Sequence, residues 1–276
     1  MPASPFPARG SRRYSLAHGS GEEVDMRLAG KSTIVTGAGQ GFGEGIAKLF
    51  AREGAEVVVA DINPVTAEKV AEEIRASGGK AVAVACDVST DAGTAAMVRT
   101  ALDRFGRLDV IVNNAGITHV NKPCTEVTEE EFDRIMAVNV KSLFWAAKHV
   151  VPIMQSRGGG VILTTASTAG IRPRPGLVWY NTSKGAAITA TKALAIELAP
   201  FKIRVNCLCP VAGETPLLPA FMGGDTPELR EKFRATVPLG RLSTPLDVAR
   251  AALFLASDEA EFLTGVALEV DGGRCI

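Results

Sequence analysis

From Leu28 onward, short apolar runs alternate with longer segments in which apolar residues recur at helical spacing. The short runs are apolar at successive positions, as are the strands of a parallel sheet that is buried on both faces. The longer segments are typical of helices that cover such a sheet. The pattern predicts an α/β fold, a doubly wound parallel sheet of seven strands with helices on both faces.

The expected elements can be placed by residue number. The apolar runs predict strands at 32–35, 56–60, 81–86, 110–112, 160–165, 203–208 and 266–270. The amphipathic segments predict helices at 43–52, 65–77, 92–105, 129–155, 179–198 and 245–256. A long loop is expected after the sixth strand. No internal repeat or Pro/Gly-rich linker divides residues 26–276, which favours a single domain.

The first 25 residues differ from the rest of the chain. They are rich in Pro, Ser, Gly and Arg and lack apolar periodicity, which predicts a disordered N-terminal extension over residues 1–25. Arg9, Arg12 and Arg13 among serines are a faint indication of a transit peptide. Two simpler alternatives are a dispensable extension and an upstream start codon, with the functional chain beginning at Met26. A secretory signal is not expected, because no hydrophobic core segment is present.

Composition narrows the class of protein. With 30 basic residues, 30 acidic residues and 46% hydrophobic residues, the chain has the balance of a globular protein with one large core. The neutral balance argues against an electrostatic nucleic-acid binder. No apolar run approaches the roughly 20 residues that a membrane span needs. We therefore expect neither a nucleic-acid nor a membrane partner, and a cytoplasmic location.

The five cysteines predict reduced structural thiols and no metal site. Cys207 and Cys209 lack the two-residue spacer of zinc and redox pairs, and their alternation places both thiols on one face of a strand. The other three, Cys86, Cys124 and Cys275, are scattered. Three histidines in the whole chain also disfavour a histidine-based zinc centre.

Tyr180 and Lys184 are the first candidate catalytic residues. Residues four apart share a helix face, so the ammonium group can lie beside the phenol. A free phenol has a pKa of roughly 10, and a fixed cation is expected to lower it. The pair would then suit acid–base chemistry near neutral pH. Alone, such a pair is more often a solvated helix face.

A glycine-rich turn follows the first predicted strand and opens the first helix. Its spacing is Thr-Gly-x-x-x-Gly-x-Gly over 36–43, and the Gly-x-Gly-x-x-Gly fingerprint does not fit it in any register. In a Rossmann-type fold, such a turn brings backbone amides and a helix dipole to a pyrophosphate. The alternative is a plain structural turn. The predicted dinucleotide contacts here are Gly37, Gln40, Gly41, Phe42 and Gly43.

Asp61 favours NAD over NADP. It closes the second strand, 24 residues after Gly37, where a carboxylate accepts hydrogen bonds from ribose hydroxyls and repels a 2′-phosphate. Neither Gln40 nor Ile62 offers the cation that an NADP site would use. The alternative role for Asp61 is that of a helix N-cap. Asp87 and Val88, after the third strand, would reach the adenine or cap the next helix.

Together these motifs resemble the short-chain dehydrogenase/reductase family, from about Leu28 to the end of the chain. Asn-Asn-Ala-Gly at 113–116 follows the fourth strand, and Asn139 lies within the fourth helix. Ser167 precedes Tyr180 by 13 residues, the separation usual in the family. Asp-Gly-Gly at 271–273 follows the last strand. Each motif is weak alone, and their order and spacing together are specific.

The resemblance implies roles for these residues. Tyr180 would exchange a proton with the substrate oxygen, Ser167 would hydrogen-bond that oxygen, and Lys184 would lower the pKa of Tyr180 and hold the nicotinamide ribose. Asn139 would hold a water that links Lys184 to solvent. Asn114, Ala115, Gly116, Pro210 and Thr215 would complete the cofactor site, with Tyr180 and Lys184. The family also implies a homotetramer.

The segment after the sixth strand departs from the family pattern. Pro210 is followed by Val211 where the family has glycine, so the backbone there must avoid positive φ. Residues 211–238 fall where the family keeps a mobile lid over the substrate; the alternative is an ordinary helix pair packed on the core.

Arg172 and Arg174 would suit an anionic substrate or carrier, although such a pair is usually just solvated.

The favoured function is an NAD-dependent oxidoreductase that interconverts a secondary alcohol and its ketone, with a small molecule as substrate. One alternative is an NADPH-dependent 3-oxoacyl-(carrier protein) reductase, which the acidic Asp61 disfavours. A second alternative, of another class, is a catalytically silent protein that senses the dinucleotide. The presence of Ser167, Tyr180 and Lys184 argues against that class.

Overall fold

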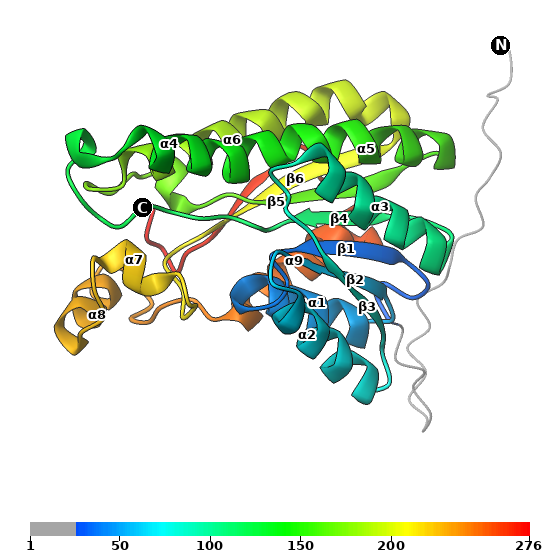
Figure 1. Ribbon diagram of the computed structural model, residues 1–276, viewed down its shortest axis with the longest axis horizontal. Coiled ribbons are helices and arrows are strands. Elements are labelled where there is room, and N and C mark those ends of the chain that lie inside the picture. The colour runs from blue at the N-terminus through cyan, green and yellow to red at the C-terminus, as the bar shows by residue number, and fades with distance from the viewer. Residues whose placement is uncertain (1–25) are drawn as a thin grey trace, which may run out of the picture.

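A parallel sheet of seven strands forms the centre of the computed structural model, which describes residues 26–276 (Figure 1). The predicted extension 1–25 lies outside the described residues. The strands are β1 (Ser32–Thr36), β2 (Glu56–Asp61), β3 (Lys80–Ala85), β4 (Val110–Asn113), β5 (Gly160–Thr165), β6 (Ile203–Pro210) and β7 (Ala267–Val270). Their order in the sheet is β3-β2-β1-β4-β5-β6-β7. The predicted seven-stranded doubly wound fold is confirmed.

Helices cover both faces of this sheet. They are α1 (Gly41–Arg52), α2 (Pro64–Ala76), α3 (Asp91–Phe105), α4 (Glu129–Met136), α5 (Ser142–Arg157), α6 (Val178–Leu198), α7 (Leu218–Met222), α8 (Pro227–Arg234) and α9 (Pro245–Ala256). Short 3-10 helices span Cys124–Glu126, Thr168–Gly170, Ala199–Phe201 and Asp258–Ala260. Figure 1 shows α1, α2 and α9 on one side of the sheet and α5 and α6 on the other.

The two faces carry separate hydrophobic cores because successive strand residues point to opposite sides. In β1, Val35 packs in the cluster that also holds Ile46 of α1 and Val248 of α9. Its neighbour Ile34 packs in the cluster that holds Met97 of α3 and Val150 of α5. Both β1 residues are fully buried, so the strand has to be apolar on both faces, as the sequence shows.

The strand order reverses at β1, which pairs with β2 on one side and with β4 on the other. All these strands run parallel, so the carboxyl ends of β1, β2 and β4 meet at one edge of the sheet. Ligands of open α/β sheets bind in the crevice outside the carboxyl ends at such a switch point. The topology therefore brings Thr36, Asp61 and Asn113 to the edge where the site is expected.

The predicted continuous helix 129–155 is interrupted in the structure. Its first part, α4, begins with a capping box in which the side chains of Thr128 and Glu131 each accept a backbone N–H of the other residue. Residues Ala137–Lys141 then form one π-helical turn before α5 begins. Asn139 lies in this turn, and its side chain bonds to a neighbouring loop and helix. Such single π turns occur frequently at functional sites.

Among residues 26–276, none of the helices has both the length and the apolar content that a membrane crossing requires.

Candidate active site

The glycine-rich turn between β1 and α1 has the shape of a phosphate cradle. Gly37 and Gly41 adopt φ of +60° and +59°, which side-chain-bearing residues rarely adopt. A Cβ on Gly37 would lie 2.9 Å from the Cα of Ala115, and one on Gly43 would overlap the carbonyl oxygen of Gly37. Within the described residues, no side chain caps the N-terminus of α1 at Gln40. Its first amides are therefore free to bind an anion.

Asp61 holds this turn against the end of β2. One carboxylate oxygen accepts a hydrogen bond from the Gly39 amide at 2.9 Å, and the other accepts from the Asn63 amide at 3.0 Å. The N-cap of α2 is Asn63, whose side chain accepts from the Val65 amide at 3.0 Å. The alternative of Asp61 as the helix cap is therefore wrong.

Asp87 is likewise separate from the helix cap. Its carboxylate accepts hydrogen bonds from the amide and the hydroxyl of Ser89, at 2.9 and 2.7 Å. The N-cap of α3 is Thr90. Asp87 and Val88 both line the cavity that starts at the glycine-rich turn.

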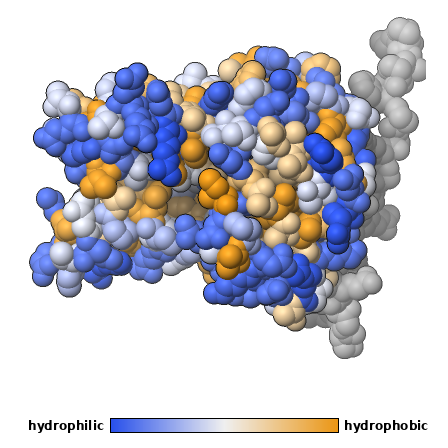
Figure 2. All heavy atoms as spheres, viewed as in Figure 1, coloured by the Kyte–Doolittle hydropathy of each residue, from blue (hydrophilic) through white to orange (hydrophobic). Residues whose placement is uncertain are grey.

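A cavity of about 420 Å³ joins the expected cofactor end to the expected substrate end. Figure 2 shows the corresponding hollow between the α7–α8 side and the α4–α6 side, with apolar residues on its walls. Its lining includes nearly all of the predicted site residues: Gly37, Gln40, Gly41, Phe42, Asp61, Asp87, Val88, Asn114, Ala115, Gly116, Ser167, Tyr180, Lys184, Pro210 and Thr215. The other two predicted site residues, Gly43 and Asn139, do not line the cavity.

Tyr180 and Lys184 are both buried, on the first two turns of α6. The Tyr180 side chain lies near that of Ser167, which follows β5, and Ser167 favours the ionised form of the phenol. The Lys184 Nζ donates to the carbonyl oxygen of Thr165 at 2.7 Å and lies 5.8 Å from the centroid of the Tyr180 ring. The structure thus places Ser167, Tyr180 and Lys184 together at the end of β5.

The sequence predicted that Lys184 lowers the pKa of Tyr180, whereas in the structure the pKa of Tyr180 is raised. Burial raises the pKa of Tyr180 to about 12, and Ser167 opposes this rise in part. Burial also lowers the pKa of Lys184 to about 8. The spacing in the sequence showed that the two side chains are neighbours. It did not show that both are enclosed, and burial disfavours the charged form of each.

Asn139 acts as a link between three segments. Its Oδ1 accepts from the Ile117 amide at 2.9 Å, and its Nδ2 donates to the Ile117 carbonyl and to the Ser183 hydroxyl, each at 2.9 Å. A Cβ on Gly116 would lie 3.2 Å from the Lys184 Nζ and 3.4 Å from the Asn139 Oδ1. The glycine therefore allows these two polar groups to approach the loop after β4.

Asn114 ties the ends of three strands together. Its Nδ2 donates to the carbonyl oxygen of Thr36 at 2.9 Å, and its Oδ1 accepts from the Thr165 hydroxyl at 3.1 Å. Thr165 was not among the predicted site residues, although its carbonyl also holds Lys184. Its position as the last residue of a predicted strand beside Ser167 was the available signal.

The segment 211–238 forms two short helices, α7 and α8, beside the substrate end of the cavity. Phe221 of α7 packs edge-on against Tyr180, with ring centroids 4.9 Å apart. The side-chain amide of Asn121 donates to the Phe221 carbonyl at 3.4 Å. Val211 is buried and lies outside the positive-φ residues of the described chain, as its side chain requires.

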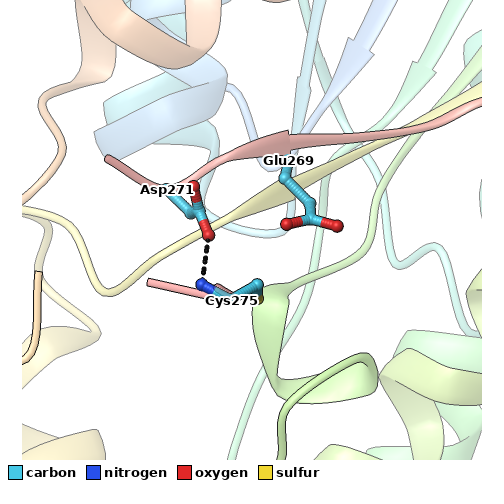
Figure 3. A group of neighbouring side chains, drawn as sticks. All are labelled: Glu269, Asp271 and Cys275. Carbon is cyan, nitrogen blue, oxygen red and sulfur yellow. Dashed lines mark hydrogen bonds between the residues drawn. The ribbon is translucent and has the colours of Figure 1, made fainter. Parts of the chain in front are cut away.

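Glu269, Asp271 and Cys275 lie together near the end of the chain, with potential ligand atoms within 4.8 Å of one another (Figure 3). Both carboxylate oxygens of Asp271 accept backbone hydrogen bonds, from Gly273 at 2.9 Å and from Cys275 at 2.7 Å. Asp271 therefore organises the turn that follows β7.

The predicted placement of Cys207 and Cys209 on one face of a strand is confirmed in β6, where both side chains are fully buried in the same cluster.

Comparisons with known proteins identify the family of this chain. A family model described as "Enoyl-(Acyl carrier protein) reductase" matches residues 37–274. The 4-formylbenzenesulfonate dehydrogenase of Comamonas testosteroni is 50% identical over 252 residues, 91% of this chain and 100% of that protein. The cyclopentanol dehydrogenase of the same species is 40% identical over 247 residues, 90% of this chain and 98% of that protein.

Two solved structures also superpose well. A 3-ketoacyl-(acyl-carrier-protein) reductase from Brucella melitensis, complexed with NADH, has a TM-score of 0.85 at 51% identity and covers 90% of this chain and 100% of that one. A 7α-hydroxysteroid dehydrogenase complexed with NADH and 7-oxo glycochenodeoxycholic acid has a TM-score of 0.85 at 40% identity, covering 90% and 96%. The chain belongs to the short-chain dehydrogenase/reductase family, whose members are oxidoreductases that use a nicotinamide dinucleotide.

Proposed function

We propose that this protein is an NAD-dependent oxidoreductase that interconverts a secondary alcohol and its ketone. The observation that carries the proposal is the proximity of Ser167 and Tyr180, with Lys184 buried beside them, at one end of a cavity that has Asp61 at the other. The dehydrogenase relatives support the reaction class, and the NADH in two related structures supports the cofactor.

The residues present fit a dinucleotide. The turn packs so closely at Gly37 and Gly43 that a Cβ there would collide with Ala115 and with the Gly37 carbonyl, and its residues Gly37, Gln40, Gly41 and Phe42 line the cavity. Asn114, Ala115 and Gly116 would line the middle of the cofactor, and Pro210 and Thr215 its nicotinamide end. When bound, the nicotinamide would supply or accept the hydride, and the protein would hold the two reacting carbons in alignment.

The proton moves through Tyr180. In ketone reduction its hydroxyl donates to the substrate oxygen, and in alcohol oxidation the same oxygen accepts the proton. Ser167 would hydrogen-bond the substrate oxygen and hold it in reach of Tyr180. Lys184 would stabilise the phenolate that forms during reduction, because its ammonium is fixed on the Thr165 carbonyl. Asn139 would position the loop at Ile117 and a proton path toward Lys184.

Asp61 supports NAD over NADP. Its carboxylate is fixed beside the glycine turn by the Gly39 amide, at the adenosine end of the cavity. The basic residues of the lining are Arg134, Arg172, Arg174 and Lys184. None of these comes from β2 or from the loop after it, so a 2′-phosphate at Asp61 would meet a carboxylate instead of a cation.

A 3-oxoacyl-(carrier protein) reductase is the second candidate. The Brucella melitensis structure of that title, 51% identical, favours it, and its complex contains NADH. Two other comparisons concern small acidic molecules, a formylbenzenesulfonate and a glycine-conjugated bile acid. These favour a free small molecule over a carrier-bound one. A homotetramer, which the family resemblance implies, and the cytoplasmic location expected from the sequence complete the proposal. Analytical ultracentrifugation tests the first.

Initial rates with a panel of secondary alcohols, polyols and 3-hydroxyacyl thioesters, each with NAD and with NADP, test the proposal. Turnover with NAD that falls by about 10²- to 10⁴-fold in Tyr180→Phe would support it. Turnover restricted to NADP and thioesters would favour the acyl reductase. NAD binding without turnover of any substrate would favour the dinucleotide-sensing class. Circular dichroism of Tyr180→Phe controls for its folding.

A further inference from the structure

Two arginines line the substrate end of the cavity, and a third lies next to them. Arg172 and Arg174 lie in the loop before α6 and line the cavity together with Tyr180. Arg274 lies near the end of the chain and is 9% exposed. The carbonyl oxygen of Arg274 accepts a hydrogen bond from Arg172, and its guanidinium charge acts on Arg174, so the three are neighbours. We call these three residues the arginine cluster.

Polar groups and one aromatic ring hold the arginine cluster in place. Arg172 Nη1 donates to the carbonyl oxygen of Arg274 at 2.8 Å and to the main-chain oxygen of Ile276 at 2.9 Å. Arg174 Nη2 donates to the Thr236 hydroxyl at 2.9 Å, and its guanidinium lies 4.6 Å from the centroid of the Phe233 ring. These contacts fix the positions of both side chains, and those of Arg174 do not neutralise its charge.

The charges of Arg174 and Arg274 are uncompensated within residues 26–276. Neither forms an ion pair with a carboxylate there, and the Nε and Nη1 of Arg274 are buried without any hydrogen-bond partner in that range. Burial, together with the charges of Arg274 and Arg172, lowers the pKa of Arg174 to about 10. A buried guanidinium without a partner is costly, so such a group signals a missing anion.

Arg204 shows what a structural arginine looks like in the same chain. It too is partly buried, and it donates to the carbonyl oxygens of Leu255 at 2.7 Å and of Ser257 at 3.0 Å. The negative charges of Asp258 and Glu261 act on it and raise its pKa against the effect of burial. Arg174 has no carboxylate among the charges that act on it, so a purely structural role does not account for the arginine cluster.

Resting on the function proposed above, we propose that the arginine cluster binds an oxyanion group of the substrate. The substrate is then an alcohol or ketone with an apolar body, set against Phe221 and Phe233, and an acidic group at the far end from the reacting carbon. Guanidinium forks bind carboxylate, sulfonate and phosphate oxygens in the same two-pronged geometry. A carboxylate, a sulfonate or a phosphate on the substrate would therefore each fit the arginine cluster.

The charge distribution along the cavity supports this orientation. The acidic residues of the lining, Asp61 and Asp87, belong to the adenosine end, whereas Arg172 and Arg174 border the end with Tyr180. An anionic substrate is attracted to the second end and repelled from the first. The apolar side chains between Tyr180 and the arginines, Phe221 and Phe233, suit a body without charge.

Binding of unreactive probes tests the proposal without turnover. The probes are benzoate against benzamide, benzenesulfonate against benzenesulfonamide, and phenyl phosphate, measured by calorimetry with and without saturating NADH. We expect at least one anion to bind about ten- to hundredfold more tightly than its neutral counterpart. The anion that binds best identifies the acidic group.

Substitutions assign the preference to the arginine cluster. In Arg172→Met and in Arg174→Met the ratio of anion to neutral affinity should fall toward one, and Arg174→Lys should restore part of it. Arg99→Met, at an exposed arginine of α3 outside the cavity lining, should leave the ratio unchanged. Arg172 is itself exposed, so its variant keeps the test usable if Arg174→Met fails to fold.

Three outcomes would overturn the proposal: no anion binds, the neutral probes bind equally well, or the ratio persists in both methionine variants. The inference and the proposed function fail separately. An arginine-dependent ratio in a protein that oxidises no alcohol would leave the inference standing and reject the function. Turnover of an alcohol that carries an acidic group, at a rate that the arginine variants do not alter, would do the reverse.

Discussion

The Lys184 ammonium donates a hydrogen bond of 2.7 Å to the carbonyl oxygen of Thr165, and this bond fixes a cation where β5 ends. The side chain of Thr165 reaches in the other direction, to the Oδ1 of Asn114. One residue of the sheet therefore orients both the proposed catalytic lysine and an amide of the cofactor wall. The position of the Lys184 side chain therefore depends on the end of β5 as well as on α6.

Replacing this lysine should remove activity. In Lys184→Met we expect kcat/KM for alcohol oxidation with NAD to fall by about 10²- to 10⁴-fold, because the phenolate of Tyr180 loses its fixed cation. Steady-state rates measure the loss. Lys192→Met, an exposed lysine on the same helix two turns later, is the matched control and should retain wild-type rates. Equal losses in both variants would point to damage of α6 as a whole.

Oxidation and reduction should respond to pH in opposite ways. Burial raises the pKa of Tyr180 to about 12, so near neutral pH the hydroxyl keeps its proton and is ready to donate it in reduction. Oxidation needs the ionised oxygen, so its kcat/KM should climb by up to about tenfold per pH unit below the apparent pKa. Burial lowers the pKa of Lys184 to about 8, so its ammonium also loses its proton within the range of such a profile.

Profiles of kcat/KM in both directions check this expectation. The reduction profile should be flat near neutral pH and should decline only on the alkaline side. An oxidation rate that stays constant between about pH 6 and about pH 9 would show that proton transfer from substrate to Tyr180 does not limit the reaction.

The choice between the two cofactors should depend on Asp61. In Asp61→Ala we expect the KM for NAD to rise by about tenfold and the preference for NAD over NADP to shrink, since both the ribose partner and the repulsion of a 2′-phosphate disappear. Ratios of kcat/KM with NAD and NADP measure the change. Asp103→Ala, an exposed carboxylate of α3, is the control. An unchanged ratio in Asp61→Ala would mean that other groups select the cofactor.

Two glycines beside Lys184 should respond differently to a methyl group. Gly185 lies in the middle of α6, and a Cβ there would meet its nearest neighbour, the Gly170 carbonyl, at 3.9 Å. Gly185→Ala should therefore raise the free energy of unfolding by about 0.5–1 kcal/mol. A Cβ on Gly170 would lie 2.8 Å from the Gly185 amide nitrogen, so Gly170→Ala should destabilise. Denaturant unfolding measures both, and destabilisation by Gly185→Ala would contradict the geometry.

The layers of the fold could be predicted from the sequence because burial determines which neighbouring residues are apolar. A strand such as β1 is covered on both faces, and its residues Ile34 and Val35 are both apolar for that reason. The order of motifs predicted that the proposed cofactor and proton-transfer residues meet at one edge of the sheet, and most of them line one cavity. These features follow from neighbours along the chain.

The remaining features depend on partners that are distant in sequence. The π turn at Asn139 arises beside Ile117 and Ser183, and the helical spacing of 129–155 carries no sign of it. The raised pKa of Tyr180 reflects its enclosure, which spacing cannot report. Arg274 joins Arg172 from 102 residues away, so a single motif could not include both.

The π turn of Ala137–Lys141 has a consequence for how the gene can change. A π turn holds one residue more than regular helical hydrogen bonding would, so removing any one of its residues would restore an ordinary helix. The helix after the deletion would keep its facing, because the wider π turn with its extra residue covers about the same rotation as the α-helical stretch that would replace it. Leu143, Ala146 and Val150 would therefore stay in the core. The side chains inside the turn would move, so Asn139 would lose the position from which it bonds Ile117 and Ser183. A single-residue deletion here should therefore damage the site while it leaves the core packing of α5 intact.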